Sequence, residues 1–227
     1  MRIVILPTEV EASNFAAEFI TEFINNNKNP VVGLATGGSV VMTYEALISK
    51  HQLGQVSFQE TTTFNLDEYL GLAPNHAQSY RSYMNRTLFE HIDIDPSKTY
   101  VPECFDNNFD SACSSYENEI NKRGGIGLQL LGIGSNGHIG FNEPTSSFQS
   151  RTRVKTLTKS TLTQNARFFE ASENQPSLAI TMGIGTIMEA ENILLIGLGK
   201  HKSKAVADVI EGCLLYTSPS PRDATLS

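Results

Sequence analysis

Four side chains that could move or hold protons lie in two short motifs. Asp67 follows the apolar run 61–65, and Asn136, His138 and Glu143 lie within the glycine-containing stretch 130–144. A histidine titrates near neutral pH, and a carboxylate can act as a general base when its pKa suits the task. These residues predict acid–base chemistry on a small molecule. The alternative is a glycine turn with an exposed histidine, a capping glutamate and a solvated acidic pair.

A second group of residues has the character of an anion site. The loop Thr36-Gly37-Gly38-Ser39 stands between an apolar run and a helical pattern. Backbone N–H groups and the dipole at a helix start favour negative charge there. Arg167 could add a bidentate contact and Lys202 a point charge. The alternatives are an ordinary strand-to-helix turn, with Ser39 as its N-cap, and two surface cations.

Apolar runs alternate with amphipathic patterns, so that these motifs fall at strand ends. Strands are expected at residues 2–6, 31–35, 61–65, 128–133, 178–182 and 193–198. The first helix is expected to begin at the capping box of Thr8 and Glu11 and to end at 25–27. Further helices are expected at residues 40–48, at 80–88, from Asp110 to 124, at 160–169, shortly before 190 and at 205–210. The pattern predicts an α/β fold, doubly wound around a mostly parallel sheet with helices on both faces. Ligands bind such sheets at the carboxyl ends of the strands.

Composition limits the classes of function. The 227 residues carry a net charge of −7, which disfavours a nucleic-acid surface. The three cysteines show no metal-ligand spacing, and no His, Cys and carboxylate cluster does either, so no metal site is expected. No run is long enough to span a membrane, and the start of the chain turns polar too early for a signal peptide. A cytoplasmic location is expected.

The end of the chain differs from the rest. Residues 213–227 contain Pro219 and Pro221 and have no amphipathic period. We therefore expect one domain over residues 1–212 and a non-native tail over 213–227. The alternative is a genuine disordered terminus.

Taken together, the motifs resemble those of the glucosamine-6-phosphate deaminases. The resemblance spans residues 1–212 and is carried by GLATGGSV, TTFNLDEYLGL, SYRSYMN, LLGIGSNGHIGFNEP, SRTRVKTLT, NARFF, TMGIGTIMEA and the Lys202 helix ending in VIEG. It implies a Rossmann-like fold related to ribose-5-phosphate isomerase and 6-phosphogluconolactonase. Family members continue into a final strand after the Lys202 helix, and this strand is expected to be missing here.

The resemblance also implies a reaction. Glucosamine 6-phosphate and water would become fructose 6-phosphate and ammonia, an isomerisation with hydrolytic deamination in amino-sugar (N-acetylglucosamine) catabolism, without cofactor or metal. Asp67 would move a proton between C2 and C1, and His138, supported by Glu143, would open the sugar ring. Asn136 stands where some members have Asp; it can hold a hydrogen bond but cannot ionise.

Binding roles follow in the same way. The resemblance implies that Thr36, Gly37, Gly38, Ser39, Arg167 and Lys202 hold the substrate's phosphate. Ser146, Arg153, Lys155 and Met1 match positions at which hexameric relatives bind N-acetylglucosamine 6-phosphate as an activator, and a homo-oligomer is expected. The alternative for residues 146–157, an extended excursion outside the main sheet, is a basic solvated lid.

Two other functions share these features. A 6-phosphogluconolactonase-like hydrolase has the same general plan, although Glu143 and the intact NLDEY motif favour the deaminase. A non-catalytic sugar-phosphate sensor would use the same loop and leave Asp67 and His138 idle. No helix-turn-helix pattern or basic region accompanies the motifs, as a DNA-binding regulator would need.

Overall fold

A computed structural model describes residues 1–103, 108–143, 146–158, 162 and 175–211. The helices are α1 (Glu9–Asn26), α2 (Val41–Gln52), α3 (Tyr80–Thr87), α4 (Phe109–Lys122), α6 (Ile184–Met188) and α7 (Ser203–Ile210). The strands are β1 (Val31–Leu34), β2 (Thr62–Asn65), β3 (Asp67–Tyr69), β4 (Thr99–Tyr100), β5 (Leu128–Gly132), β6 (Arg153–Thr156), β7 (Leu178–Thr181) and β8 (Asn192–Ile196). Short 3-10 turns include η1 (Gly38–Val40) and η5 (Lys200–Lys202).

The main sheet has five parallel strands in the order β4-β2-β1-β5-β8. The chain first winds outward from β1 through β2 to β4, then returns to the other side of β1 and continues through β5 to β8. This reversal is the topological switch of a doubly wound fold, and it falls between β1 and β5. The predicted fold class is therefore confirmed, and the loops after β1 and β5 lie at its ligand-binding position.

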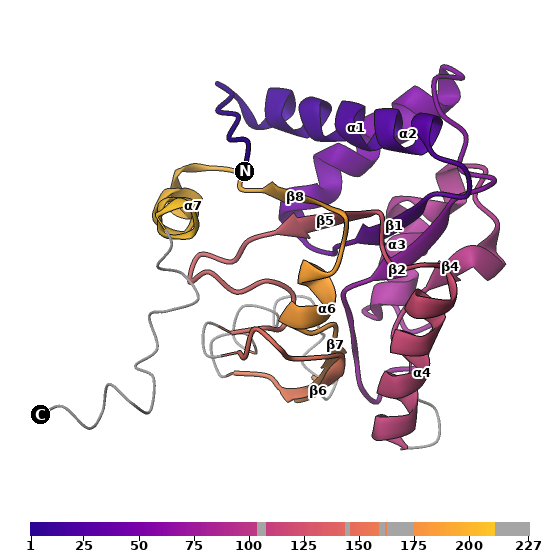
Figure 1. Cartoon of the computed structure of the whole chain (residues 1–227), viewed down its shortest axis with the longest axis vertical. Helices are drawn as coiled ribbons and strands as arrows, with labels where there is room; N and C mark the ends of the chain where they lie inside the picture. Colours follow the sequence, from indigo (N-terminus) through magenta and orange to yellow (C-terminus); the bar gives the residue numbers. More distant parts are fainter. Residues whose placement is uncertain (104–107, 144–145, 159–161, 163–174, 212–227) are drawn as a thin grey trace, which may run out of the picture.

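Helices cover both faces of this sheet. Figure 1 shows α1 and α2 along one face, and α4 and α6 on the other. All four residues of β1 are buried, because both faces of the strand are covered. The capping box of α1 forms as expected: Thr8 accepts a hydrogen bond from the Glu11 backbone, and the Glu11 carboxylate accepts one from the Thr8 backbone.

A small antiparallel sheet, β3-β7-β6, lies beside the carboxyl ends of the main strands. The segment 178–182 was expected as one more strand in the series, but β7 belongs to this second sheet. Residues 146–157 lie outside the main sheet, as predicted, and contribute β6. One backbone bond, from Met182 N to Leu66 O, ties the end of β7 to the chain between β2 and β3.

Two local expectations were wrong. Residues 2–6 form no strand, and Ile3, Val4 and Ile5 are exposed because they pair with none of the described strands. Helix α4 is capped by Asn108, whose side chain accepts from the Ser111 N–H, and Asp110 lies inside its first turn. The expected helix 160–169, the strand missing after the Lys202 helix and the tail 213–227 lie outside the described residues. Within them β8 is an edge strand.

Candidate active site

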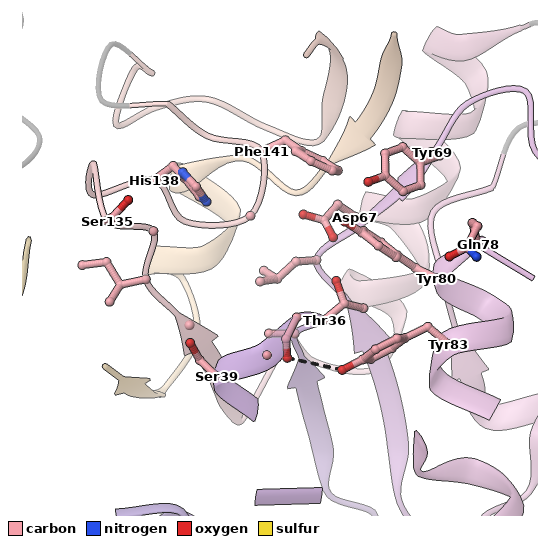
Figure 2. Close-up of a pocket in the computed structure, with 18 of the residues that line it drawn as sticks. Thr36, Ser39, Asp67, Tyr69, Gln78, Tyr80, Tyr83, Ser135, His138 and Phe141 are labelled. Carbon is pink, nitrogen blue, oxygen red and sulfur yellow. Dashed lines mark hydrogen bonds between the residues drawn. The ribbon is translucent and has the colours of Figure 1, made fainter. Parts of the chain in front are cut away.

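A cavity of about 380 Å³ opens at the switch point between β1 and β5. This volume is in the range of sites for small metabolites. Its walls come from the loop after β1, the start of β3, helix α3, the loop after β5 and η5. Figure 2 shows Asp67 and His138 pointing into the cavity from different elements, with Thr36 and Ser39 at its base. Segments far apart in the sequence thus meet at one set of strand ends.

The loop after β1 has the geometry of an anion site. Gly37 has a φ of 108°, in the left-handed region that favours glycine, and η1 begins directly after it. The turn runs into α2, so backbone N–H groups without helical partners stand at the cavity. The Tyr83 hydroxyl donates to Gly37 O over 3.3 Å, and Tyr80 of the same helix lines the cavity together with Thr36. Helix α3 therefore holds this loop in place.

Asp67 is the first residue of β3 and is only 5% exposed. Burial and the neighbouring Glu68 charge raise the pKa of Asp67 to about 8. A hydrogen bond from the Phe141 backbone has a weaker, opposite effect. A carboxyl group with a pKa near neutrality can accept and return a proton efficiently. Gly140 lies close by, since a Cβ there would stand 3.0 Å from Asp67 Oδ2.

Glu68 has a structural position instead. Its carboxylate accepts hydrogen bonds from the backbone N–H groups of Tyr69, Tyr80 and Arg81 at 2.8, 2.9 and 2.9 Å. Two of these donors begin α3, so Glu68 fixes the start of that helix. The sequence suggested an exposed acidic pair after β2, but both carboxylates are buried, because residues 67–69 form a strand of the small sheet.

His138 is linked to Glu143 through the side chain of Asn136. Asn136 Nδ2 donates to Glu143 Oε2 at 2.9 Å, and Asn136 Oδ1 lies 2.6 Å from His138 Nδ1. An amide oxygen is only an acceptor, so the neutral imidazole carries its proton on Nδ1 and leaves Nε2 free to accept one. Gly134 is required here, because a Cβ on it would stand 2.3 Å from His138 Nδ1.

Burial of the imidazole favours its neutral form. Burial lowers the pKa of His138, the Glu143 carboxylate opposes this, and the Lys202 ammonium adds to it. Lys202 itself lines the cavity, and partial burial lowers its pKa too. Near neutral pH His138 can therefore act first as a base.

The predicted site residues fall into three groups. Thr36, Gly37, Gly38, Ser39, Asp67, His138 and Lys202 line the cavity, whereas Asn136 and Glu143 reach it through His138. Arg167 lies outside the described residues. The residues of the predicted activator site form the third group. Arg153 Nη2 donates to Ser146 Oγ at 3.2 Å, and Lys155 is half-buried nearby on β6. The N-terminus lies away from these residues, beside β8 and α7 (Figure 1).

Helix α3 supplies lining residues that the sequence reasoning missed. Tyr80, Tyr83 and Arg86 face the cavity, and Tyr80 stacks on Phe141 with ring centroids 6.1 Å apart. Their spacing of three residues puts them along one side of a helix, which was the available signal. The sequence analysis used this segment as the SYRSYMN motif and gave its residues no role in the site.

Two general features complete the description. Among the described residues, no three His, Cys, Asp or Glu side chains are grouped as metal ligands would be. In the same part of the chain, no helix has the length and apolar character needed to cross a lipid bilayer.

The chain was compared with known proteins. The family described as "Glucosamine-6-phosphate isomerases/6-phosphogluconolactonase" matches residues 8–221. A relative named glucosamine-6-phosphate deaminase from Shewanella woodyi is 51% identical over 97% of this chain and 83% of its own length. One of the same name from a Thermoanaerobacter species is 44% identical over 97% of this chain and 87% of its own.

Solved structures agree with this grouping. A structure described as a monomeric glucosamine-6-phosphate deaminase matches with a TM-score of 0.89 and 44% identity, covering 93% of this chain and 88% of that one. The 6-phosphogluconolactonase of Thermotoga maritima matches with a TM-score of 0.68 and 18% identity, covering 88% and 86%, a likeness of fold alone. From its matched length and its identity to these relatives, the chain belongs to the glucosamine-6-phosphate isomerase/6-phosphogluconolactonase family.

Proposed function

We propose that this protein converts glucosamine 6-phosphate and water into fructose 6-phosphate and ammonia. The observation that carries the proposal is one cavity in which an anion loop, a buried carboxyl group and a neutral imidazole meet. The relatives that are about half identical to this chain are named for this deaminase, which supports the same substrate. The family's name covers an isomerase and a lactonase, and the residues of the cavity favour the isomerase chemistry described below.

The phosphate would bind first. The N–H groups after β1 and the Lys202 ammonium would hold it, with the Thr36 and Ser39 hydroxyls as further partners. Binding at this remote group fixes the sugar carbons relative to Asp67 and His138. Such orientation lowers the barrier of the later steps, because the entropy of alignment is lost during binding.

Ring opening would use His138. The free Nε2 takes the proton from the O1 hydroxyl of the closed sugar, the C1–O5 bond breaks, and the same proton is returned to O5. The product is the open aldehyde. While the imidazole is protonated, Glu143 stabilises the positive charge through the Asn136 amide.

Asp67 would then carry out the isomerisation. Its carboxylate removes the proton from C2 while O1 takes a proton from the substrate's own ammonium, giving an enolamine. The proton held by Asp67 then returns at C1. Water adds to the resulting C2 imine, and the C2–N bond breaks to release ammonia. A pKa near 8 leaves much of Asp67 protonated at neutral pH, but the substrate's own ammonium at C2 would lower that pKa again.

The experiment compares two substrates. The purified protein is given glucosamine 6-phosphate, with ammonia and fructose 6-phosphate measured together, and separately 6-phosphogluconolactone, with lactone hydrolysis measured. We expect ammonia and fructose 6-phosphate in equal amounts and no lactone hydrolysis above the spontaneous rate. Lactone hydrolysis without ammonia would establish the hydrolase instead, and binding of both ligands without turnover would establish a sensor.

For regulation, we infer an activator site for an N-acetylated amino-sugar phosphate around Arg153. Arg153 bonds Asn142 Oδ1 at 2.9 Å and Ser146, and Asn142 lies in the loop that ends at Glu143. Because Met1 lies elsewhere in a single chain, a site that uses both needs a second copy of the protein. The test is kinetic: if N-acetylglucosamine 6-phosphate leaves the dependence of rate on substrate concentration unchanged, the activator site is ruled out. If the protein is strictly monomeric in solution, the role of Met1 is ruled out.

A further inference from the structure

Two cations line the cavity among the described residues, and the reaction above uses only Lys202. The other is Arg86, on α3 and exposed to solvent. Within the described part of the chain its guanidinium forms no ion pair. An arginine at a cavity mouth without a carboxylate partner is free to meet an incoming anion.

Arg86 and Lys202 line the cavity from different elements, α3 and η5. Arg86 follows Tyr83 by one helical turn, and the Tyr83 hydroxyl bonds Gly37 O of the loop. Its charge also acts on Tyr83, since it lowers the pKa of that hydroxyl against the larger effect of burial. Lys202, by contrast, acts on the imidazole of His138, at the end of β5. The two cations therefore stand on separate elements of the cavity that also contains the loop.

A phosphate monoester carries close to two negative charges near neutral pH, and one ammonium balances only one of them. Asp67 opens into the same cavity and repels the anion whenever it is ionised. A guanidinium can bind two phosphate oxygens at once, which a lysine cannot. We propose that Arg86 contacts the substrate's phosphate from the α3 side of the Thr36–Ser39 loop, as a further cation of the phosphate site beside Lys202. This inference rests on the proposed function.

Arg86→Gln tests the contact. We expect KM for glucosamine 6-phosphate to rise about tenfold, in line with the loss of one charged hydrogen bond at a partly exposed site, with kcat unchanged. The dissociation constant of inorganic phosphate, measured by calorimetry, should rise by a similar factor, and Arg86→Lys should recover part of both. Lys28→Gln is the matched control. This exposed lysine precedes the amino end of β1, whereas the cavity lies at the carboxyl ends of the strands, so its loss should change neither value. Unchanged KM and phosphate affinity in Arg86→Gln would overturn the proposal.

A second variant separates direct contact from action through Tyr83. Tyr83→Phe removes the hydroxyl that bonds Gly37, and Arg86→Gln is then made in that background. A direct contact predicts the same rise in KM in both backgrounds, whereas no additional rise would show that Arg86 only positions Tyr83. Phosphate binding also separates the two proposals: if the protein binds phosphate through Arg86 but releases no ammonia, the proposed function fails and the cation site stands.

Discussion

His138 Nδ1 and Asn136 Oδ1 lie 2.6 Å apart, and this contact determines which ring nitrogen faces the substrate. The other end of the amide is held by Glu143, so the amide cannot turn over without losing its bond to the carboxylate. A neutral group therefore stands between the imidazole and Glu143, the carboxylate that acts on it among the described residues. The amide oxygen orients the imidazole as a carboxylate at this position would, but it stabilises the protonated imidazolium less than a carboxylate would.

Replacing Asn136 by Asp should raise the pKa of His138, because a carboxylate beside Nδ1 stabilises the imidazolium. The imidazole must be neutral to begin ring opening, so the acidic limb of the activity profile should move to higher pH. NMR titration of His138, assigned by comparison with His138→Gln, measures the shift. Glu143→Gln is the opposing control and should lower the same pKa. A His138 pKa that does not rise in Asn136→Asp would contradict this account.

Gly134→Ala should displace the His138 ring, since the new Cβ would stand 2.3 Å from Nδ1. We expect turnover to fall by about 10²- to 10⁴-fold, the usual contribution of one general acid–base group. The matched control is Gly132→Ala, two residues earlier, where the Cβ would meet only Ser39 Cβ at 3.7 Å. Equal activity of the two variants, measured as ammonia release, would show that the ring has room to move.

Asp67 should make stability fall as pH rises. Its pKa is about 8 when folded against 3.8 for an unperturbed aspartate, so between these values the unfolded chain has already lost a proton that the folded chain keeps. Urea unfolding of Asp67→Asn should therefore show a gain over the parent protein that grows from pH 4 to 8, by at most about 1.4 kcal/mol per pH unit.

Asp93 supplies the control of opposite sign. Burial raises the pKa of the Asp93 carboxyl, but hydrogen bonds from Ser57 and the Phe58 backbone outweigh this effect and lower it. Its contribution is present above the unfolded pKa and lost as pH falls, so Asp93→Asn should destabilise at neutral pH and progressively less in acid. A pH-independent gain in Asp67→Asn would show that the Asp67 carboxyl is ionised in the folded protein.

Glu68→Gln should loosen the start of α3. The amide oxygen can still accept two N–H groups, but its NH₂ would face the third donor and leave it unpaired. A cost of about 1–3 kcal/mol in the free energy of unfolding is expected from one unsatisfied buried donor. Because α3 holds Tyr80 and Tyr83 against the anion loop, KM should rise as well. Calorimetric unfolding and steady-state kinetics check the two effects, and unchanged stability would argue against the cap.

Much of the main sheet could be predicted from local sequence. The runs at 31–35, 61–65 and 128–133 form strands that are largely buried because both of their faces are covered, and the run at 193–198 forms the partly exposed edge strand β8. Local pattern misled at residues 2–6, where strand-forming residues find no partner strand among the described ones. It also missed the short strand Asp67–Tyr69, whose partner β7 lies more than a hundred residues later.

The site was predictable to a similar depth. The motifs around Thr36, Asp67 and His138 gave the lining at three strand ends. The burial of Asp67, the bridging position of Asn136 and the contribution of α3 depend on contacts between distant segments, so no local pattern reports them. The roles of Arg167 and of the predicted activator residues stay predictions.

The most direct test measures ammonia released from saturating glucosamine 6-phosphate by the parent protein and by Asp67→Asn, with inorganic phosphate binding measured on both. The account predicts that the parent protein releases ammonia, that Asp67→Asn loses at least about 10²-fold in kcat, and that Asp67→Asn binds phosphate at least as tightly as the parent protein. Ammonia release by Asp67→Asn at the parental rate, or none from a parent protein that binds phosphate, would contradict it.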